Sequence, residues 1–447
     1  MKTQSVRLGT ESIKKLIIEL SIPAIFGMLL IAMYNIVDAF LISWGVGVRG
    51  LAGVTVALPF HLFLMAISQM LGIGAGSIIS RALGKKEQKK ADLTFSTTVI
   101  TSFFIGILLA FLVYIFKDVF INLSGGDKET YFFAKNYVLY LLPGVPFLIL
   151  LIAVNNIVRS EGNTKKAMEV MFISGIINII LDYIFIFRLN MNTDGVALAT
   201  SISWIAGFFH LVFYFLNKNS SIRINIRNFK FKFNVLKEVI GIGAASFLRQ
   251  ISASILVIVL NNILPIYGGF GVIAVLGIIN RINMFIFLPM FGVLQGVNPV
   301  IGYNFGAGNI KRVKEAVYFS VFLTSIMGLF YIVIIFFFSH NIFSFFSDDP
   351  ILVKHGKQAL LYSHIALLLA GFQIIASGLF QALGRVKVSL WVSLLRQFIF
   401  LIPLFFIMGR FFKLDGIWLS YPVSDVISSI VIFILVIREF KKLGRER

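Results

Sequence analysis

The sequence predicts an all-α polytopic membrane protein with twelve transmembrane helices in two six-helix lobes, related by a pseudo-two-fold axis along the membrane normal. Composition is the first observation behind this prediction: 58% of the 447 residues are hydrophobic and 13% are charged, whereas about 25% of a soluble domain is charged. The second observation is that basic residues gather in alternate loops between long apolar runs. The third is that the second half of the chain repeats the first.

Twelve segments are apolar over the roughly 20 residues that a helix needs to cross a bilayer core of about 30 Å. They lie near residues 16–43, 51–82, 93–116, 131–158, 167–187, 195–216, 236–264, 271–303, 316–338, 357–383, 387–408 and 416–437. The polar start MKTQSVRLGTESIKK precedes an apolar run that is much longer than the apolar core of a cleavable signal. We therefore expect an uncleaved first helix.

The connections between these segments alternate between basic loops and loops with few basic residues. The basic set comprises RALGKKEQKK, RSEGNTKK, NKNSSIRINIRNFKFK, NIKRVKE, GRVK and the tail REFKKLGRER. By the positive-inside rule this set is cytoplasmic, which places both termini inside. We expect a monomeric, multi-pass protein of the inner (cytoplasmic) membrane. Its net charge of +20 then reflects topology and contact with the lipid bilayer, and we expect no nucleic-acid partner.

Four motifs recur at an offset of 220 to 222 residues. They pair LSIPA with IGIGA, ALGKKEQKK with NFGAGNIKR, EGNTK with LGRVK, and TDGVALATSIS with LDGIWLSYPVS. Each repeat holds six helices, so both lobes have the same orientation in the membrane. The repeat predicts a first lobe at 1–216, a cytoplasmic linker at 217–235 and a second lobe at 236–447. Two such lobes around a central cleft suit transport by alternating access.

Polar residues interrupt several spans of the first lobe. Asp38 shares a helix face with Tyr34, and Asn178 shares one with Asp182, because residues four apart are neighbours on a helix. Thr200 lies in the sixth span, which opens with TDGVALATSIS. Intramembrane acids mark ion paths by default, and carboxylate, amide and hydroxyl oxygens suit H⁺ or Na⁺. The alternative is that the acids only hydrogen-bond neighbouring helices.

The second lobe carries arginines where the first has acids. Arg249, Arg281 and Arg396 lie roughly 9–13 residues into their spans, too deep for easy snorkelling to the interface. Asp425 is the deep acid of this lobe. One interpretation is a structural network of arginines with Asp425. The other is that one or two of these arginines, with Arg281 the first choice and Arg249 the next candidate, face the cleft and bind an anionic group of a substrate or lipid.

Five stretches together resemble the multidrug and toxic compound extrusion (MATE) family, in its DinF- and MepA-like prokaryotic branch: LSIPAIFGMLLIAMYNIVDAFLIS, GIGAGSIISRALG, NNIVRSEGNTKKAM, NIILDYIFIF and DGVALATSIS. The resemblance covers nearly the whole chain. It implies twelve helices in two lobes and export coupled to H⁺ or Na⁺. It also implies a coupling site at Asp38, Asn178, Asp182 and Thr200, with Tyr34 and Asn155 in the nearby cavity. Tyr183 departs from the pattern, since related sequences usually have proline after the aspartate.

We therefore expect a secondary active antiporter that exports organic, drug-like and often cationic compounds in exchange for H⁺ or Na⁺, without a cofactor. The alternative is a flippase for lipid or lipid-linked saccharide from the same superfamily, whose members often have more spans. A membrane enzyme would need a catalytic constellation such as a paired Asp-x-Asp near one interface, and a channel would need a filter-like loop. Neither is evident in the sequence, so we expect no enzyme.

Overall fold

The computed structural model describes residues 4–217, 220–223, 230–269 and 271–445, and over these ranges the chain is helical and contains no strand. The first lobe consists of α1 (Gln4–Thr10), α2 (Ile13–Gly45), α3 (Val48–Gly84), α4 (Gln88–Leu123), α5 (Tyr131–Leu141), the 3₁₀ turn η1 (Leu142–Gly144), α6 (Val145–Ser160), α7 (Thr164–Tyr183), the π-turn η2 (Ile184–Arg188) and α8 (Thr193–Leu216). The second lobe consists of α9 (Phe233–Gly268), α10 (Gly271–Gly306), α11 (Ile310–Phe346), α12 (Pro350–His364), α13 (Leu367–Ala382), α14 (Val386–Leu394), the π-helical η4 (Leu395–Leu401) and α15 (Ile402–Arg445).

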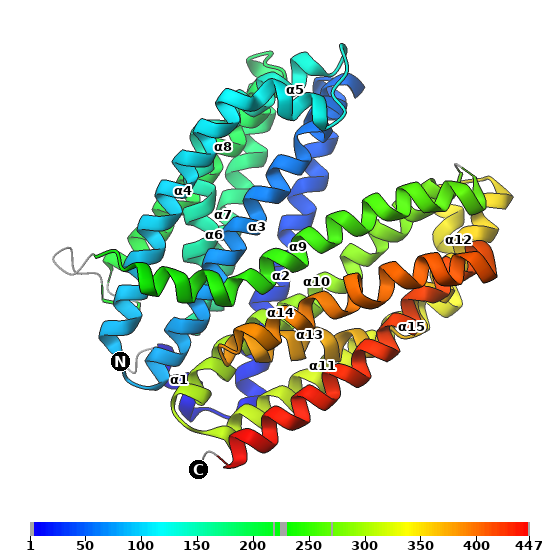
Figure 1. Ribbon diagram of the computed structural model, residues 1–447. Coiled ribbons are helices and arrows are strands. Elements are labelled where there is room, and N and C mark those ends of the chain that lie inside the picture. The colour runs from blue at the N-terminus through cyan, green and yellow to red at the C-terminus, as the bar shows by residue number, and fades with distance from the viewer. Residues whose placement is uncertain (1–3, 218–219, 224–229, 270, 446–447) are drawn as a thin grey trace.

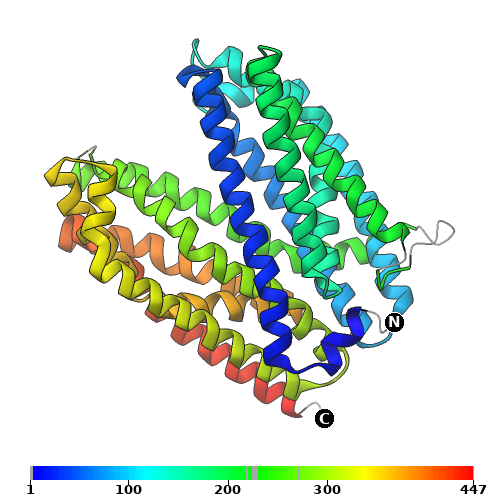
Figure 2. The same ribbon diagram turned by 180° about the vertical axis from the view of Figure 1, so that it is seen from behind.

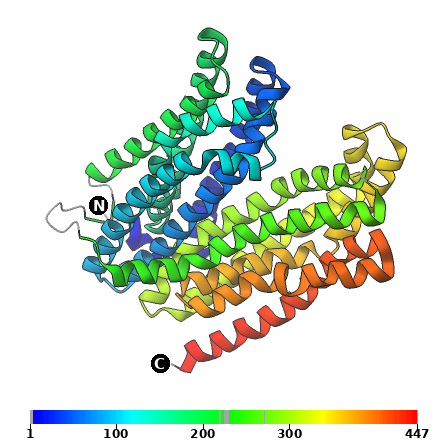
Figure 3. The ribbon, with the colours of Figure 1, turned by 45° about the horizontal axis from the view of Figure 1, so that its top comes forward.

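The described part of the chain supports the predicted twelve crossings. Ten helices are long and apolar enough to span a membrane, and α12 with α13, bent by 49° at their junction, forms an eleventh span. The last of the ten, Val386–Arg445, turns back at Lys413, whose φ of 52° is not helical. Figure 3 shows its two arms side by side, so that this element crosses twice.

The helices extend beyond the apolar segments from which they were predicted. The structure gives α3 37 residues, which is about 55 Å at 1.5 Å per residue and exceeds the bilayer core of about 30 Å. Hydropathy marks only the apolar part of a helix, and charged residues continue it into water. The short helix α1, with Leu8 fully buried, was not predicted because it is polar and brief.

The repeat is also visible in backbone conformation. Gly47 and Gly269 both have left-handed φ angles, of 89° and 70°, and they lie 222 positions apart. The same spacing relates Gly162 (φ 89°) to Gly384 (φ 73°). Glycine adopts this region without steric cost. Equivalent turns of the two lobes therefore use the same conformation, which supports the predicted pseudo-two-fold relation.

The lobes lie together at the end that holds both termini and diverge toward the end that holds α5 and α12 (Figure 1). We call these the closed end and the open end. Figure 2 shows α2 running from the closed end along the second lobe and on to the far end of the first. The contacts between lobes are made chiefly by α2 with α10 and by α3 with α9.

Glycines bring the backbones of these helices into contact. A Cβ on Gly243 of α9 would overlap the carbonyl of Met70 in α3, and one on Gly296 of α10 would lie 2.8 Å from the backbone nitrogen of Ser21 in α2. Small residues permit such close approach between membrane helices. Met70 and Gly292, the latter against Ile25, are themselves 222 positions apart, so the two crossings are equivalent in the repeat.

A buried glutamate holds the described part of the linker against the first lobe at the closed end. Glu161 is fully buried, and its carboxylate accepts hydrogen bonds from the Ser220 hydroxyl at 2.8 Å and from the Ser221 amide. Burial raises the pKa of Glu161 from 4.5 to about 7. The predicted linker 217–235 includes residues 218–219 and 224–229, which lie outside the described residues.

We expect Gly243→Ala to destabilise the closed end, because the new Cβ must push α3 and α9 apart. Overpacking of this kind costs roughly 1–3 kcal/mol. Thermal unfolding of the purified protein in detergent measures the loss. The control is Gly277→Ala on α10, where an added Cβ meets nothing within 4 Å. Equal melting temperatures for the two variants would contradict the glycine-dependent crossing.

We expect Glu161→Gln to change how stability depends on pH. The folded state keeps the Glu161 proton up to a pH of about 7, whereas the ordinary pKa is 4.5. Stability of the wild type therefore falls as pH rises through this window, by at most roughly 3 kcal/mol. The variant lacks this loss, so its melting temperature should rise relative to that of the wild type between pH 4.5 and about pH 7, and the difference should stay constant above that. The exposed Glu87→Gln is the control, and identical pH profiles for all three proteins would show that Glu161 stays ionised without cost.

Candidate functional site

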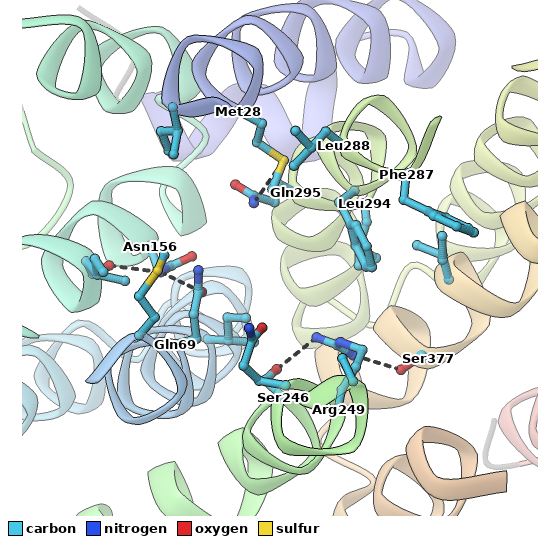
Figure 4. A pocket seen from close by; sticks show the side chains of 18 of the residues that line it. Met28, Gln69, Asn156, Ser246, Arg249, Phe287, Leu288, Leu294, Gln295 and Ser377 are labelled. Carbon is cyan, nitrogen blue, oxygen red and sulfur yellow. Dashed lines mark hydrogen bonds between the residues drawn. The ribbon is translucent and has the colours of Figure 1, made fainter. Parts of the chain in front are cut away.

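A cavity of about 680 Å³ lies between the lobes and is lined by side chains from both. Figure 4 shows Met28 and Leu288 on one side of it and Gln69 and Arg249 on the other. The volume falls in the range of about 300–1,000 Å³ that holds drug-sized ligands, and a mostly apolar wall with a few polar groups is usual for such sites. The cavity can therefore accept an amphipathic organic molecule.

The first-lobe wall carries hydrogen-bonding side chains along α3 and α6. The Asn156 amide donates to Gln69 Oε1 at 3.2 Å. Arg159, one turn further along α6, is only 7% exposed, and its guanidinium donates to the side chain of Gln295 in α10 of the other lobe. Arg159 thus connects the two lobes from inside the cavity.

Three of the four residues predicted for a substrate cavity line this one: Tyr34, Asn155 and Arg249. Arg281 is exposed and is not among the lining residues, although the two asparagines that flank it are. Those asparagines are three positions apart and share a helix face, whereas Arg281 is about 100° around the helix from the first of them. The role of each residue in binding stays a prediction.

The four residues predicted to hold the coupling ion come from α2, α7 and α8, which pack side by side in the first lobe. Asn178 Nδ2 donates to Thr200 Oγ1 at 3.4 Å, and both residues line the cavity. Asp182 is fully buried one turn from Asn178, and its carboxyl lies close enough to that of Asp38 for each charge to act on the other. Neither acid is among the lining residues, but each lies one helical turn from one that is, Asp38 from Tyr34 and Asp182 from Asn178.

The two carboxyls lack hydrogen-bond donors in the part of the chain that the structure describes. Both oxygens of Asp182 and Oδ1 of Asp38 are buried without a partner. A buried ionised carboxylate without a partner is very costly, and two of them close together in a low dielectric cannot easily both stay ionised. The arrangement therefore suits a site where a cation or a proton neutralises the pair.

Two features near the acids were not predicted. Tyr137 of α5 is buried within electrostatic range of both Asp38 and Asp182. Directly after Tyr183, α7 continues into the π-turn η2. Such turns are frequent at functional sites in helices. Tyr137 carries no sequence signal, because a tyrosine in an apolar span resembles any core aromatic residue.

Arg396 and Asp425 form an ion pair in the second lobe. The Nε of Arg396 lies 2.6 Å from Oδ1 of Asp425. This ion pair joins the two arms of the element Val386–Arg445. The guanidinium also lies over the ring of Phe287, 5.8 Å from its centre. The expected network of arginines with Asp425 is therefore present for Arg396. Among the described residues Arg249 and Arg281 make no ion pair with Asp425.

Arg249 instead contacts only neutral groups. Its terminal nitrogens donate to the hydroxyls of Ser246 at 3.1 Å and Ser377 at 3.2 Å, as Figure 4 shows. No carboxylate lies within ion-pair distance of it in the described chain. Arg249 is therefore a cation in the cavity wall whose charge is not neutralised by the ion pairs described.

Arg159 and Gln295 are two of the cavity residues that the sequence interpretation does not identify. The motif RSEGNTKK was read as a cytoplasmic loop, and the fourth span was predicted to end at 158. In the structure α6 continues through Ser160, and Arg159 is a buried wall residue. A basic residue directly after an apolar run could be a loop charge or the last buried turn, and only packing decides which.

Comparison with known proteins gives a consistent result. A family model described as MatE matches residues 23–184 and again 244–407, together more than half of the chain. The multidrug export protein MepA of Staphylococcus aureus (strain COL) is 30% identical over 427 residues, covering 94% of this chain and 93% of that protein. The protein of the same description from Staphylococcus saprophyticus is 30% identical over 427 residues, covering 95% and 94%.

Solved structures show the same fold. A crystal structure of MATE in the bent conformation has a TM-score of 0.94 and 26% identity, covering 100% of this chain and 99% of that one. A MOP superfamily transporter from Pyrococcus furiosus has a TM-score of 0.92 and 26% identity, covering 99% and 100%. The description of the latter says that reverse polarity of its binding pocket suggests a different function.

We expect Asp425→Asn to destabilise the protein strongly, because it leaves Arg396 without its partner. Removing one member of a buried pair costs roughly 3–5 kcal/mol. The double variant Arg396→Gln with Asp425→Asn should lose less than the two single variants added together, since contacting residues are coupled. Thermal unfolding measures all three, with the exposed Arg410→Gln as control. Simple additivity would mean that the pair contributes nothing.

Proposed function

Because this chain belongs to the MATE family, we propose that it is a secondary antiporter that exports organic, drug-like compounds in exchange for H⁺ or Na⁺. One observation carries the proposal: the Asp38 and Asp182 carboxyls have three buried oxygens that lack donors in the described chain, and each acid lies one helical turn from a residue that lines a drug-sized cavity. The export of multiple drugs is what the described MepA relatives are named for.

The proposed coupling follows from the cost of the carboxylates. When the site is empty, repulsion and desolvation disfavour the packed arrangement of α2 against α7. A proton or Na⁺ removes that cost, and Asn178 and Thr200 supply neutral oxygens beside it. Because these two residues also line the cavity, loading of the ion changes the wall that contacts the substrate. The ion and the substrate would then stabilise different conformations of the first lobe.

In this proposal the basic loops determine how the protein is oriented in the membrane. The closed end holds both termini (Figure 2), and the positive-inside rule assigns that end to the cytoplasm of an inner-membrane protein. The cavity then opens outward in this state. Alternating access requires the α2–α10 and α3–α9 crossings to separate when the cavity opens to the cytoplasm. We propose a monomer in the lipid bilayer, without a nucleic-acid partner, a cofactor or an enzymatic step.

The proposal departs from one expectation, that the compounds are often cationic. Among the described lining residues three arginines stand against one acid, Asp425, which Arg396 already neutralises. A cation would meet no uncompensated negative charge on these walls. The proposed function therefore does not require a cationic substrate.

We expect Asp38→Asn and Asp182→Asn each to abolish coupled export, because an amide can neither release a proton nor neutralise Na⁺. The assay is dye extrusion from proteoliposomes with imposed H⁺ or Na⁺ gradients. Loss of wild-type export with a protonophore identifies H⁺, and loss without Na⁺ identifies Na⁺. The exposed Asp348→Asn should transport normally. Export at the wild-type rate by both site variants would rule out these acids as the coupling site.

A further inference from the structure

We propose that the cavity binds the anionic group of an amphipathic compound, such as a sulfonate, carboxylate or phosphate on an apolar body, with Arg249 and Arg159 as its cationic contacts. The inference rests on the proposed function, since it names the class of compound that the exporter takes. It concerns binding, however, and can be tested without transport.

The first argument for this proposal is the charge of the side chains that line the cavity. Arg159, Arg249 and Arg396 line the cavity, and Asp425 is the acid among its described lining residues. Arg396 lies 2.6 Å from Asp425, so this pair is neutral. Neither Arg159 nor Arg249 has a carboxylate within ion-pair distance in the described chain. The walls therefore carry two uncompensated positive charges.

The second step is that both guanidiniums keep unused hydrogen-bonding capacity. Arg159 is only 7% exposed, and its Nε is buried without a partner among the described residues. Its terminal nitrogen donates to the amide oxygen of Gln295. Arg249 donates to two serine hydroxyls. Guanidinium has five donors in a planar fork that matches an oxyanion, so an anion would satisfy donors that these neutral partners leave free.

The third step concerns the rest of the ligand. Met28, Phe287 and Leu288 supply apolar contact area in the same cavity, as Figure 4 shows. An inorganic anion would leave this surface uncovered, whereas an apolar body attached to the anionic group would bury it. At about 680 Å³ the cavity has room for such a body. An anionic amphiphile therefore fits the cavity better than a small anion or a cation.

The position of the two arginines also suits transport. Arg159 belongs to α6 in the first lobe and Arg249 to α9 in the second. A ligand that contacts both bridges the lobes. Its binding energy then depends on how the lobes are placed, which is the differential affinity between states that alternating access requires.

The test uses two fluorescent probes that differ by one group, anilinonaphthalene sulfonate and phenylnaphthylamine, which lacks the sulfonate. Binding is titrated on the purified full-length protein in a neutral detergent, without any ion gradient. We expect the wild type to bind the sulfonate at least about tenfold more tightly, since a hydrogen bond to a charged group contributes roughly 1.5–3 kcal/mol. Arg249→Gln and Arg159→Gln should each remove most of that preference and leave binding of the neutral probe within about twofold.

Two further variants keep the test decisive. Arg281→Gln removes an arginine of the same lobe that lies outside the lining, and it should retain the preference. Arg249→Lys keeps the charge and should retain part of it even if Arg249→Gln fails to fold. Equal affinity of the wild type for both probes, or equal loss of both probes in Arg249→Gln, would overturn the inference. So would a loss of preference in Arg281→Gln as large as in Arg249→Gln.

Competition by lipids distinguishes two sources of the anionic group. Displacement of the sulfonate by phosphatidylglycerol but not by phosphatidylcholine in mixed micelles would assign a lipid head group. Displacement by neither, with the probe preference intact, would assign a free amphiphile. Failure of the inference leaves the loss of export in Asp38→Asn untouched, whereas failure of the coupling proposal leaves the probe preference untouched. The two failures are therefore distinguishable.

Discussion

A charge inside a membrane protein must be neutralised, hydrated or used, and most of this structure can be understood from that constraint. Asp425 is neutralised by Arg396 at 2.6 Å. Asp38 and Asp182 have no such partner among the described residues and are left with bare buried oxygens. A bare buried carboxylate is very costly, and for this reason we interpret the first pair as structural and propose that a mobile ion is the missing partner of the second.

The fold repeats itself, but the chemistry does not. Gly47 and Gly269 show that the two lobes share their turns, and the glycine crossings at Gly243 and Gly292 are equivalent in the repeat. The charged residues break this symmetry: the acid pair Asp38 and Asp182 lies in the first lobe, and the ion pair Arg396–Asp425 lies in the second. In the proposed function, the symmetric scaffold permits the lobes to move against each other, and the asymmetric charge makes only the first lobe respond to an ion.

The two lobes contact each other at the closed end and in the wall of the cavity. Backbone contact through glycine makes the crossings of α2 with α10 and α3 with α9 tight, and hydrogen bonds between the lobes add to them, such as the one that the Ser77 hydroxyl donates to the Gln381 carbonyl. The bond from Arg159 to Gln295 is one of them, and it lies in the cavity wall. If Arg159 contacts the ligand as we propose, the same residue serves ligand binding and contact between the lobes, and this links an occupied cavity to a change at the crossings.

The sequence alone determined the class, the number of spans, the repeat and the acids, because hydropathy, loop charge and an internal offset are local or periodic signals. It also placed Asn178 one turn before Asp182 on a common face. It misjudged Arg159 as a loop charge and favoured Arg281 over Arg249 for the cavity. Both errors concern which way a side chain faces, and a helix with little amphipathic pattern gives no local signal of this. Only the packing of α6 against α10, and of α9 across from α3, decided that Arg159 and Arg249 line the cavity while Arg281 does not. The residues that pack around or pair with a buried charge lie far from it in the sequence.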